Sequence, residues 1–342
     1  MKFPEAYADP KTLWEKVYNS TPVILTVVAT ILAGLSSGAM TRSQYYRSLA
    51  AQDQAKASDQ WGYYQAKKMR SVNAGNTMDL LAATGIVGSL DPQELRSLSG
   101  KIAAAVHSDA ANELDARMKT LLGDEKSVMA FAGVEGKLPA VVDQTIEEVP
   151  VRDAMRAIAM GATDADLAGL MRQIKGSDLV DATATANGNL THFDEAVKPI
   201  GDVLDGLHTT LAELREVVES KQGPLDAAAG TNPAELLTDL TTAQASVDAA
   251  RLRFEMARYQ REAEYNGSVA AILEVEIRQA GAISDRDRKR SGNFFYGMLA
   301  AQAGVTIATL AMAVKQKNLF WSLAAMAGAV AVAFSGYIYM FT

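Results

Sequence analysis

Histidine, cysteine and paired carboxylates are the residues with which this chain could perform acid–base, nucleophilic or metal chemistry. Its 342 residues contain three histidines, His107, His192 and His208, and no cysteine. No two histidines stand at the spacing that places both on one face of a helix, and no H-E-x-x-H motif occurs. We therefore expect no metal site, and we expect His192 and His208 to be surface or coil residues.

Other catalytic arrangements are missing as well. The lack of cysteine excludes disulfide bonds, thiolate nucleophiles and zinc–thiolate sites. The glycines are scattered and form no phosphate-binding loop. The adjacent Glu147 and Glu148 form a short charged run of the kind that usually faces solvent. The sequence therefore predicts a protein that is not an enzyme, has no cofactor and has no identifiable small-molecule substrate.

Charge and composition narrow the class of protein further. The net charge of −7 and the isoelectric point of about 5.2 argue against nucleic acid as a partner, because phosphates need a basic surface. Aromatic residues make up only 7% and alanine is abundant, which favours long helices over a thick globular core. No long stretch alternates polar and apolar residues as a strand does. We therefore expect an all-α fold.

Three runs without a charged residue indicate how the chain meets a membrane: 22–40, 293–314 and 319–341. About 20 helical residues cross the hydrocarbon core of a bilayer. We expect an all-α membrane protein with one N-terminal transmembrane helix and a C-terminal hairpin of two. The small residues at 36–39 resemble a signal-peptide cleavage site, but the first run is long and begins far from the N-terminus, which favours a retained anchor.

Small residues on the three expected anchors favour close helix packing. Gly34 and Gly38 form a G-x-x-x-G pattern in the first anchor. Comparable faces in the other two contain Gly297, Ala301, Gly304, Ala308, Ala324 and Gly328. We expect these faces to pack within the three-helix anchor, with association between subunits as the alternative. The anchors carry no ionisable residue, which argues against a proton relay or a charged pore.

Turn signals divide the residues between the anchors. No helix breaker follows the first anchor until about Asn73, so we expect the helix to continue as a stalk that ends at Gly75. Asp91 before a proline predicts a helix start, and this helix is expected to run to Gly123. A later short helix is expected to begin at Thr163. Two glycines are expected to end short helices in this region: Gly161 and Gly176.

The most regular segment has apolar residues spaced by four and three in alternation: Phe193, Val197, Ile200, Leu204, Leu207, Leu211, Leu214 and Val218. This heptad pattern is typical of a coiled-coil seam. After a turn at Gly223 and Pro224, a second seam follows: Leu236, Leu240, Ala243, Val247, Ala250, Phe254 and Ala257. This second helix has no strong breaker and is expected to run about eighty residues into the membrane. The seams pair as an antiparallel hairpin or across subunits, and both arrangements bury the same stripe.

These observations predict the following segments: an N-terminal tail (1–20), transmembrane helix 1 (21–41), a stalk helix (42–75), a helical head (76–230) with the heptad helix at 190–222, a long returning helix (231–290), transmembrane helix 2 (291–315) and transmembrane helix 3 (318–342).

The stalk contains the sequence A-S-D-Q-W-G-Y-Y-Q-A-K at 57–67. It resembles the signature of a bacterial membrane-protein family catalogued as a domain of unknown function. The resemblance covers roughly 21–74 and 250–342, where K-Q-K at 315–317 is similar to the family's basic turn. It implies one N-terminal anchor, a helical middle and a C-terminal hairpin, and it implies no activity. The middle, about 76–230, is longer than in typical members.

The signature also has a physical interpretation. On a helix, Ala57, Trp61 and Tyr64 share one face. Asp59, Tyr63 and Lys67 share the neighbouring face. We expect Trp61 and Tyr64 to pack against the returning C-terminal helix, with Asp59 and Gln60 bonding polar groups across it. The alternative is a docking patch for a partner, because exposed tryptophan and tyrosine are enriched in interface hot spots.

We expect a location in the bacterial inner membrane. The N-terminal tail and the turn at 315–318 fall on one side of it, and the large domain falls on the other. The short segments on the first side carry five lysines: Lys2, Lys11, Lys16, Lys315 and Lys317. Because positive short segments stay inside, this favours a periplasmic domain. Arg42, Arg47 and the basic residues within 286–290 favour the opposite orientation.

The sequence thus predicts a membrane-anchored helical scaffold or accessory subunit. Its expected partners are the lipid bilayer and either further copies of itself or a larger membrane complex, and nucleic acid is not among them. The alternative is a membrane sensor or channel-associated regulator that couples the head to the anchors, in which cysteine pairs across the stalk would report two states. The residues expected to mediate interactions are Trp61, Tyr63, Tyr64, Asp59, Gly34, Gly38, Phe193, Leu204 and Leu211.

Overall fold

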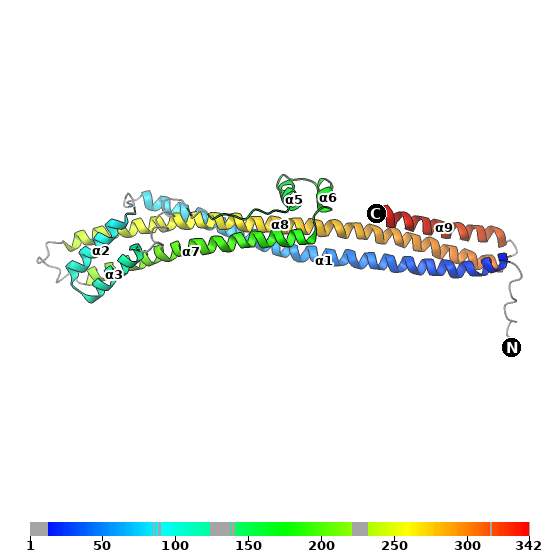
Figure 1. The fold of residues 1–342 in the computed structure, drawn as a ribbon, viewed down its shortest axis with the longest axis horizontal. Helices are drawn as coiled ribbons and strands as arrows, with labels where there is room; N and C mark the ends of the chain where they lie inside the picture. The colour runs from blue at the N-terminus through cyan, green and yellow to red at the C-terminus, as the bar shows by residue number, and fades with distance from the viewer. Residues whose placement is uncertain are drawn as a thin grey trace, which may run out of the picture. The chain divides into compact units, whose positions relative to one another are not determined.

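A computed structural model describes residues 13–83, 85, 87, 90–123, 138, 141–220, 232–314 and 317–341. Within these ranges all regular structure is helical and no strand occurs, which confirms the predicted all-α class. The helices, labelled in Figure 1, are α1 (Leu13–Ala83), α2 (Pro92–Val106), α3 (Asp109–Gly123), α5 (Val149–Ala159), α6 (Asp164–Met171), α7 (Gly176–Ser220), α8 (Pro233–Ala313) and α9 (Lys317–Phe341). The expected turns at Gly223 and at 315–316, and the tail lysines Lys2 and Lys11, lie outside the described residues.

Helix α1 is longer than expected, because it passes through Gly75 and ends at Ala83. A Cβ atom on Gly75 would lie 3.2 Å from the sulfur of Met256 on α8. The Ser71 hydroxyl donates a hydrogen bond to the Met256 carbonyl oxygen at 2.9 Å. The glycine therefore lets two helices approach closely, and this packing outweighs its helix penalty of about 1 kcal/mol. The predicted end of the stalk at Gly75 is wrong for this reason.

Two predicted helix starts are confirmed by their caps. The Asp91 side chain accepts a hydrogen bond from the N–H of Gln93 at 2.8 Å. Thr163 and Asp166 form a reciprocal capping box at the start of α6. Gly161, between α5 and α6, has a φ of +76°, a conformation that favours glycine.

The segment after Asp91 contains two helices where we expected one. His107 adopts a left-handed conformation (φ 46°, ψ 44°) that ends α2. The Ser108 hydroxyl then accepts a hydrogen bond from the N–H of Ala111 at 3.2 Å and caps α3. The serine at 108, followed by Asp109, was the sequence signal for this break. Gly176, expected to end a short helix, is instead the first residue of α7.

The chain divides into two compact units. The first, which we call the anchor unit, comprises Met1–Gln54, Ala157–Gln173 and Glu274–Thr342. The second, the head unit, comprises Ala55–Arg156 and Ile174–Leu273. Helices α1 and α8 contribute residues to both units.

Within the described residues, three helices contain a stretch that is long and apolar enough to cross a membrane: α1, α8 and α9. In the anchor unit these stretches pack through small residues. A Cβ atom on Gly328 would lie 2.4 Å from Leu25 Cδ2, and one on Gly304 would lie 3.3 Å from the Ala324 carbonyl oxygen. Ala301 and Ala324 are fully buried. Small residues let helices approach closely, and such packing is typical of helices within a membrane. The predicted small faces of the second and third anchors are confirmed.

The small face of the first anchor behaves differently. A Cβ atom on Gly34 or Gly38 would have no described atom within 4 Å. The packed side of α1 instead presents Leu25, Ala29 and Leu32 to its neighbours. The expectation that Gly34 and Gly38 pack within the bundle is therefore wrong. Their role in association between subunits stays a prediction.

In the head unit, α7 and α8 pack antiparallel around one buried cluster. Asp205 pairs with Arg251 at 3.0 Å, and the ring of Phe193 lies 5.5 Å from that of Tyr265, so the numbering falls along α8 as it rises along α7. All eight residues of the predicted α7 seam are buried in this cluster, Leu204 and Leu211 included. Residues of α8, α2 and α3 complete the cluster. The seam is thus covered by helices of the same chain.

Candidate functional site: the signature segment of α1

Helix α1 carries a third heptad seam, which the sequence analysis missed. Between residues 36 and 74 its buried and half-buried positions recur with four-three spacing: Ser36, Ala39, Ser43, Tyr46, Ala50, Asp53, Ala57, Gln60, Tyr64, Lys67, Ser71 and Ala74. The seam consists of small and polar residues, so it lacks the apolar contrast of the leucine seam in α7. The four-three spacing of serine and alanine was the signal that identifies it.

The signature segment places four of its residues on this seam. Ala57 is buried, and Gln60, Tyr64 and Lys67 are half-buried. The ring of Tyr64 lies against Gly267 of α8, where a Cβ atom would come within 3.3 Å of Tyr64 Cδ2. Glycine at 267 therefore makes room for the tyrosine ring.

Other signature residues point away from the seam. Trp61 is 39% exposed and Tyr63 is 57% exposed, and Asp59 is exposed too. The Trp61 ring meets the Tyr64 ring edge-on, with centroids 5.5 Å apart. The expectation that Trp61 and Asp59 face the returning helix is wrong. After Ala57 the seam continues at Gln60 and Tyr64, so Trp61 lies at its rim. Gln60 is turned inward, but its Oε1 atom has no hydrogen-bond partner among the described residues.

Lys67, the last residue of the signature, binds a buried carboxylate. Its ammonium group forms an ion pair with Glu262 of α8, which is only 2% exposed. Arg258 donates a charged hydrogen bond to the other carboxylate oxygen of Glu262. The Lys67 ammonium also lies 5.2 Å from the centroid of the Tyr259 ring. A buried carboxylate is tolerated only when cations and hydrogen bonds compensate for its lost hydration, and Lys67 and Arg258 provide this compensation.

Asp194 of α7 stands beside this cluster. Burial raises the pKa of its carboxyl above the ordinary value, and the Glu262 carboxylate raises it further, while Arg258 and Lys67 oppose the shift. The folded protein therefore holds this proton more tightly than the unfolded chain does. The resulting stability is present below the unfolded pKa of about 4 and is lost as the pH rises through the folded pKa.

We therefore expect Asp194→Asn to raise the melting temperature at about pH 7 and to change it little at about pH 3, where aspartic acid is already neutral. Thermal unfolding followed by circular dichroism at the two pH values measures this difference. A lower melting temperature of the variant at pH 7 would contradict the direction of the shift.

A second polar cluster holds the irregular segment 141–148 against α7 and α8. Arg261 and Tyr265 of α8 both donate hydrogen bonds to Asp143. The Asn189 side chain exchanges two hydrogen bonds with the backbone of Gln144, at 2.8 and 2.9 Å. Burial raises the pKa of the Tyr265 phenol, and its hydrogen bond to Asp143 raises it further. The phenol therefore stays protonated and acts as a donor, which is a structural role.

The three histidines occupy different settings in the fold. His208 is half-buried, and its Nδ1 atom lies 2.7 Å from the Asp248 carboxylate, so it joins α7 to α8. His107 ends α2, and His192 is exposed on α7. No group of three histidine or acidic side chains suited to a metal ion occurs in the part of the chain that the structure describes.

Comparison with known proteins identifies one region. Residues 14–119 match the family model described as "Domain of unknown function (DUF4337)". The match contains the apolar run of α1, the signature segment and α2, and it covers less than a third of the chain. No curated protein and no solved structure matches the chain. The family description supplies no activity.

Proposed function

We propose that this protein is a membrane-anchored helical scaffold or accessory subunit that acts by binding other proteins and catalyses no reaction. We further propose that it resides in the bacterial inner membrane with its large domain in the periplasm. The three apolar stretches of α1, α8 and α9 support the membrane anchor. The lysines of the short flanking segments support the orientation.

The observation that carries the proposal is an exposed apolar stripe on α1 in the head unit. Trp61, Met69, Val72 and Leu80 are 39%, 64%, 52% and 72% exposed. Their spacing of eight, three and eight residues puts them on one side of the helix. We call these four residues the outer stripe. Exposed apolar groups in line, with a tryptophan among them, are typical of a protein interface.

The outer stripe replaces the leucine seam as the expected association surface. Phe193, Leu204 and Leu211 were candidates for partner binding, but they are buried among helices of their own chain. A partner would have to dismantle the head core to reach them. The outer stripe is accessible without any rearrangement, and it begins within the signature segment at Trp61.

The test is a gentle extraction of the membrane followed by capture of a tagged full-length copy, with composition and mass measured. We expect a stoichiometric partner or a homogeneous self-assembly. In the double variant Trp61→Ala, Met69→Ala we expect affinity to fall by about thirtyfold or more, the effect of losing one interface hot spot of about 2 kcal/mol. Val180→Ala, which truncates an exposed apolar residue on α7, serves as the matched control and should leave association unchanged.

One result would contradict the scaffold proposal, and a different result would contradict the outer stripe as its binding surface. A monomeric wild-type protein without any bound protein would show that it is not a scaffold. Association that survives in the outer-stripe variant would show that a different surface mediates it.

A further inference from the structure

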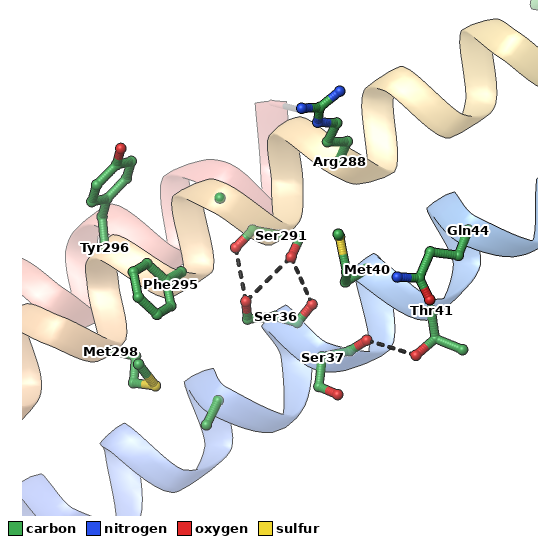
Figure 2. Close-up of a pocket in the computed structure, with 12 residues that line it drawn as sticks. Ser36, Ser37, Met40, Thr41, Gln44, Arg288, Ser291, Phe295, Tyr296 and Met298 are labelled. Atoms are coloured by element: carbon green, nitrogen blue, oxygen red, sulfur yellow. Dashed lines mark hydrogen bonds between the residues drawn. The ribbon is translucent and has the colours of Figure 1, made fainter. Parts of the chain in front are cut away.

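A groove of about 700 Å³ runs between α1 and α8 in the anchor unit (Figure 2). It lies where the charge-free runs of the two helices end. On α1 the first charged residue after the run is Arg42, and on α8 the last charged residue before the run is Arg290. These ends are at the same level of the bundle, because Arg42 pairs with the buried Asp287 at 3.5 Å.

A pair of serines in the groove lining joins the two helices. The Ser36 hydroxyl donates to the Ser291 carbonyl oxygen and the Ser291 hydroxyl donates to the Ser36 carbonyl oxygen, both at 2.9 Å. Figure 2 shows these bonds between the two helices. The two serines are therefore occupied with each other, and binding capacity in the groove comes from its other side chains.

The remaining side chains differ in chemistry along the groove. Towards the centre of the apolar runs it is lined by Ala33, Phe295 and Met298. Towards the charged end it is lined by Gln44 and Arg288, with Ser37 between the two ends. Figure 2 shows Phe295 and Met298 on one side of the serine pair and Arg288 and Gln44 on the other. Arg288 is exposed and makes no ion pair with any residue that the structure describes.

We propose that this groove binds one anionic phospholipid. Its phosphate is held by the Arg288 guanidinium, with the polar side chain of Gln44 at the same end of the groove. Its acyl chain lies along Phe295 and Met298. Only an amphiphile satisfies both ends, because a free anion leaves the apolar end uncovered and a hydrocarbon leaves Arg288 unpaired.

Charge selects an anionic lipid over a zwitterionic one. The segment 285–290 of α8 carries four cations and two carboxylates. One of these carboxylates, Asp287, is buried and paired with Arg42. The surface around Arg288 is therefore positive, and basic residues beside a membrane attract anionic headgroups.

The experiment is native mass spectrometry of the full-length protein, reconstituted in bilayers of phosphatidylglycerol and phosphatidylcholine and then extracted in mild detergent. We expect the wild type to retain one phosphatidylglycerol in preference to phosphatidylcholine. Arg288→Gln should reduce this retention about tenfold or more, the factor for one lost charge-assisted hydrogen bond. Arg286→Gln removes the same charge from the same helix outside the groove and should retain lipid as the wild type does.

A variant of the apolar end and a competition with inorganic phosphate test the site and the nature of its ligand. Ala33→Phe fills the apolar end without a change of charge and should also release the lipid. If that variant does not fold, the comparison of lipid retention in Arg288→Gln and Arg286→Gln still tests whether the groove binds the lipid. Equal losses in the two arginine variants would overturn the proposal, because they indicate diffuse attraction. Displacement of the lipid by inorganic phosphate alone would overturn it as well, since the site would then bind a free anion.

Discussion

Replacing Leu211 by alanine is expected to lower the free energy of unfolding by about 2–5 kcal/mol. Leu211 is buried in the cluster formed by α7, α8, α2 and α3. Removing its three outer carbon atoms forfeits their burial and leaves a cavity that long, packed helices fill only in part. Urea unfolding of the protein in detergent, followed by circular dichroism, measures the loss. Leu80→Ala, at an exposed position of the outer stripe, is the matched control and should change stability by about 0.5 kcal/mol or less.

The same variant tests whether the leucine seam belongs to one chain. If α7 and α8 of a single chain share it, the loss of stability is independent of protein concentration. If the seam joins subunits, unfolding is coupled to dissociation, and the midpoint shifts with concentration. A concentration-dependent loss in Leu211→Ala, or no loss at all, would contradict the packing described above.

Replacing Glu262 by alanine is expected to cost about 3 kcal/mol of stability. The substitution leaves the Lys67 ammonium and the Arg258 guanidinium facing one another without the carboxylate that both bind. This loss of stability is at the lower end of the range for a broken buried ion pair, because both cations retain partial access to water. Glu264→Ala is the matched control, since Glu264 lies two residues away, is exposed and pairs only at the surface with Arg261. Its cost should be about 1 kcal/mol or less.

A double-mutant cycle separates the ion pair from general effects of each substitution. Lys67→Ala should destabilise the wild type more than it destabilises the Glu262→Ala variant, because the second background has already lost the shared interaction. The unfolding free energies of the wild type, the two single variants and the double variant give the coupling energy between Lys67 and Glu262. Strictly additive losses would show that the last residue of the signature does not hold the buried carboxylate.

Much of the anchor and the head was predictable because local patterns determine them. Charge-free runs of membrane length mark the stretches of α1, α8 and α9 that are long and apolar enough to span a membrane, because length and composition are read from the sequence alone. The leucine seam of α7 follows from apolar spacing alone. The caps at Asp91 and Thr163 depend on side chains within one turn. Each of these signals is contained in a short window of sequence.

The candidate site was predicted only in part. The sequence singled out the signature segment, but it assigned Trp61 and Asp59 to the packed face and did not identify Lys67 as the partner of a buried carboxylate. Which side of α1 packs is decided by residues more than 180 positions away, such as Glu262 and Gly267 on α8. A helix of small and polar residues carries no strong apolar stripe that would indicate this side.

The sequence by itself therefore determined that this is an all-helical chain with three stretches able to span a membrane and a leucine-rich seam. The tertiary structure decided which small residues pack, since Gly328 meets Leu25 while Gly34 meets no described atom of the chain. It also decided that Gly75 lies within a helix and that the outer stripe, with Trp61, stays exposed. These outcomes depend on the close approach of helices distant in sequence, and the packing energy of such contacts exceeds the local preferences of single residues.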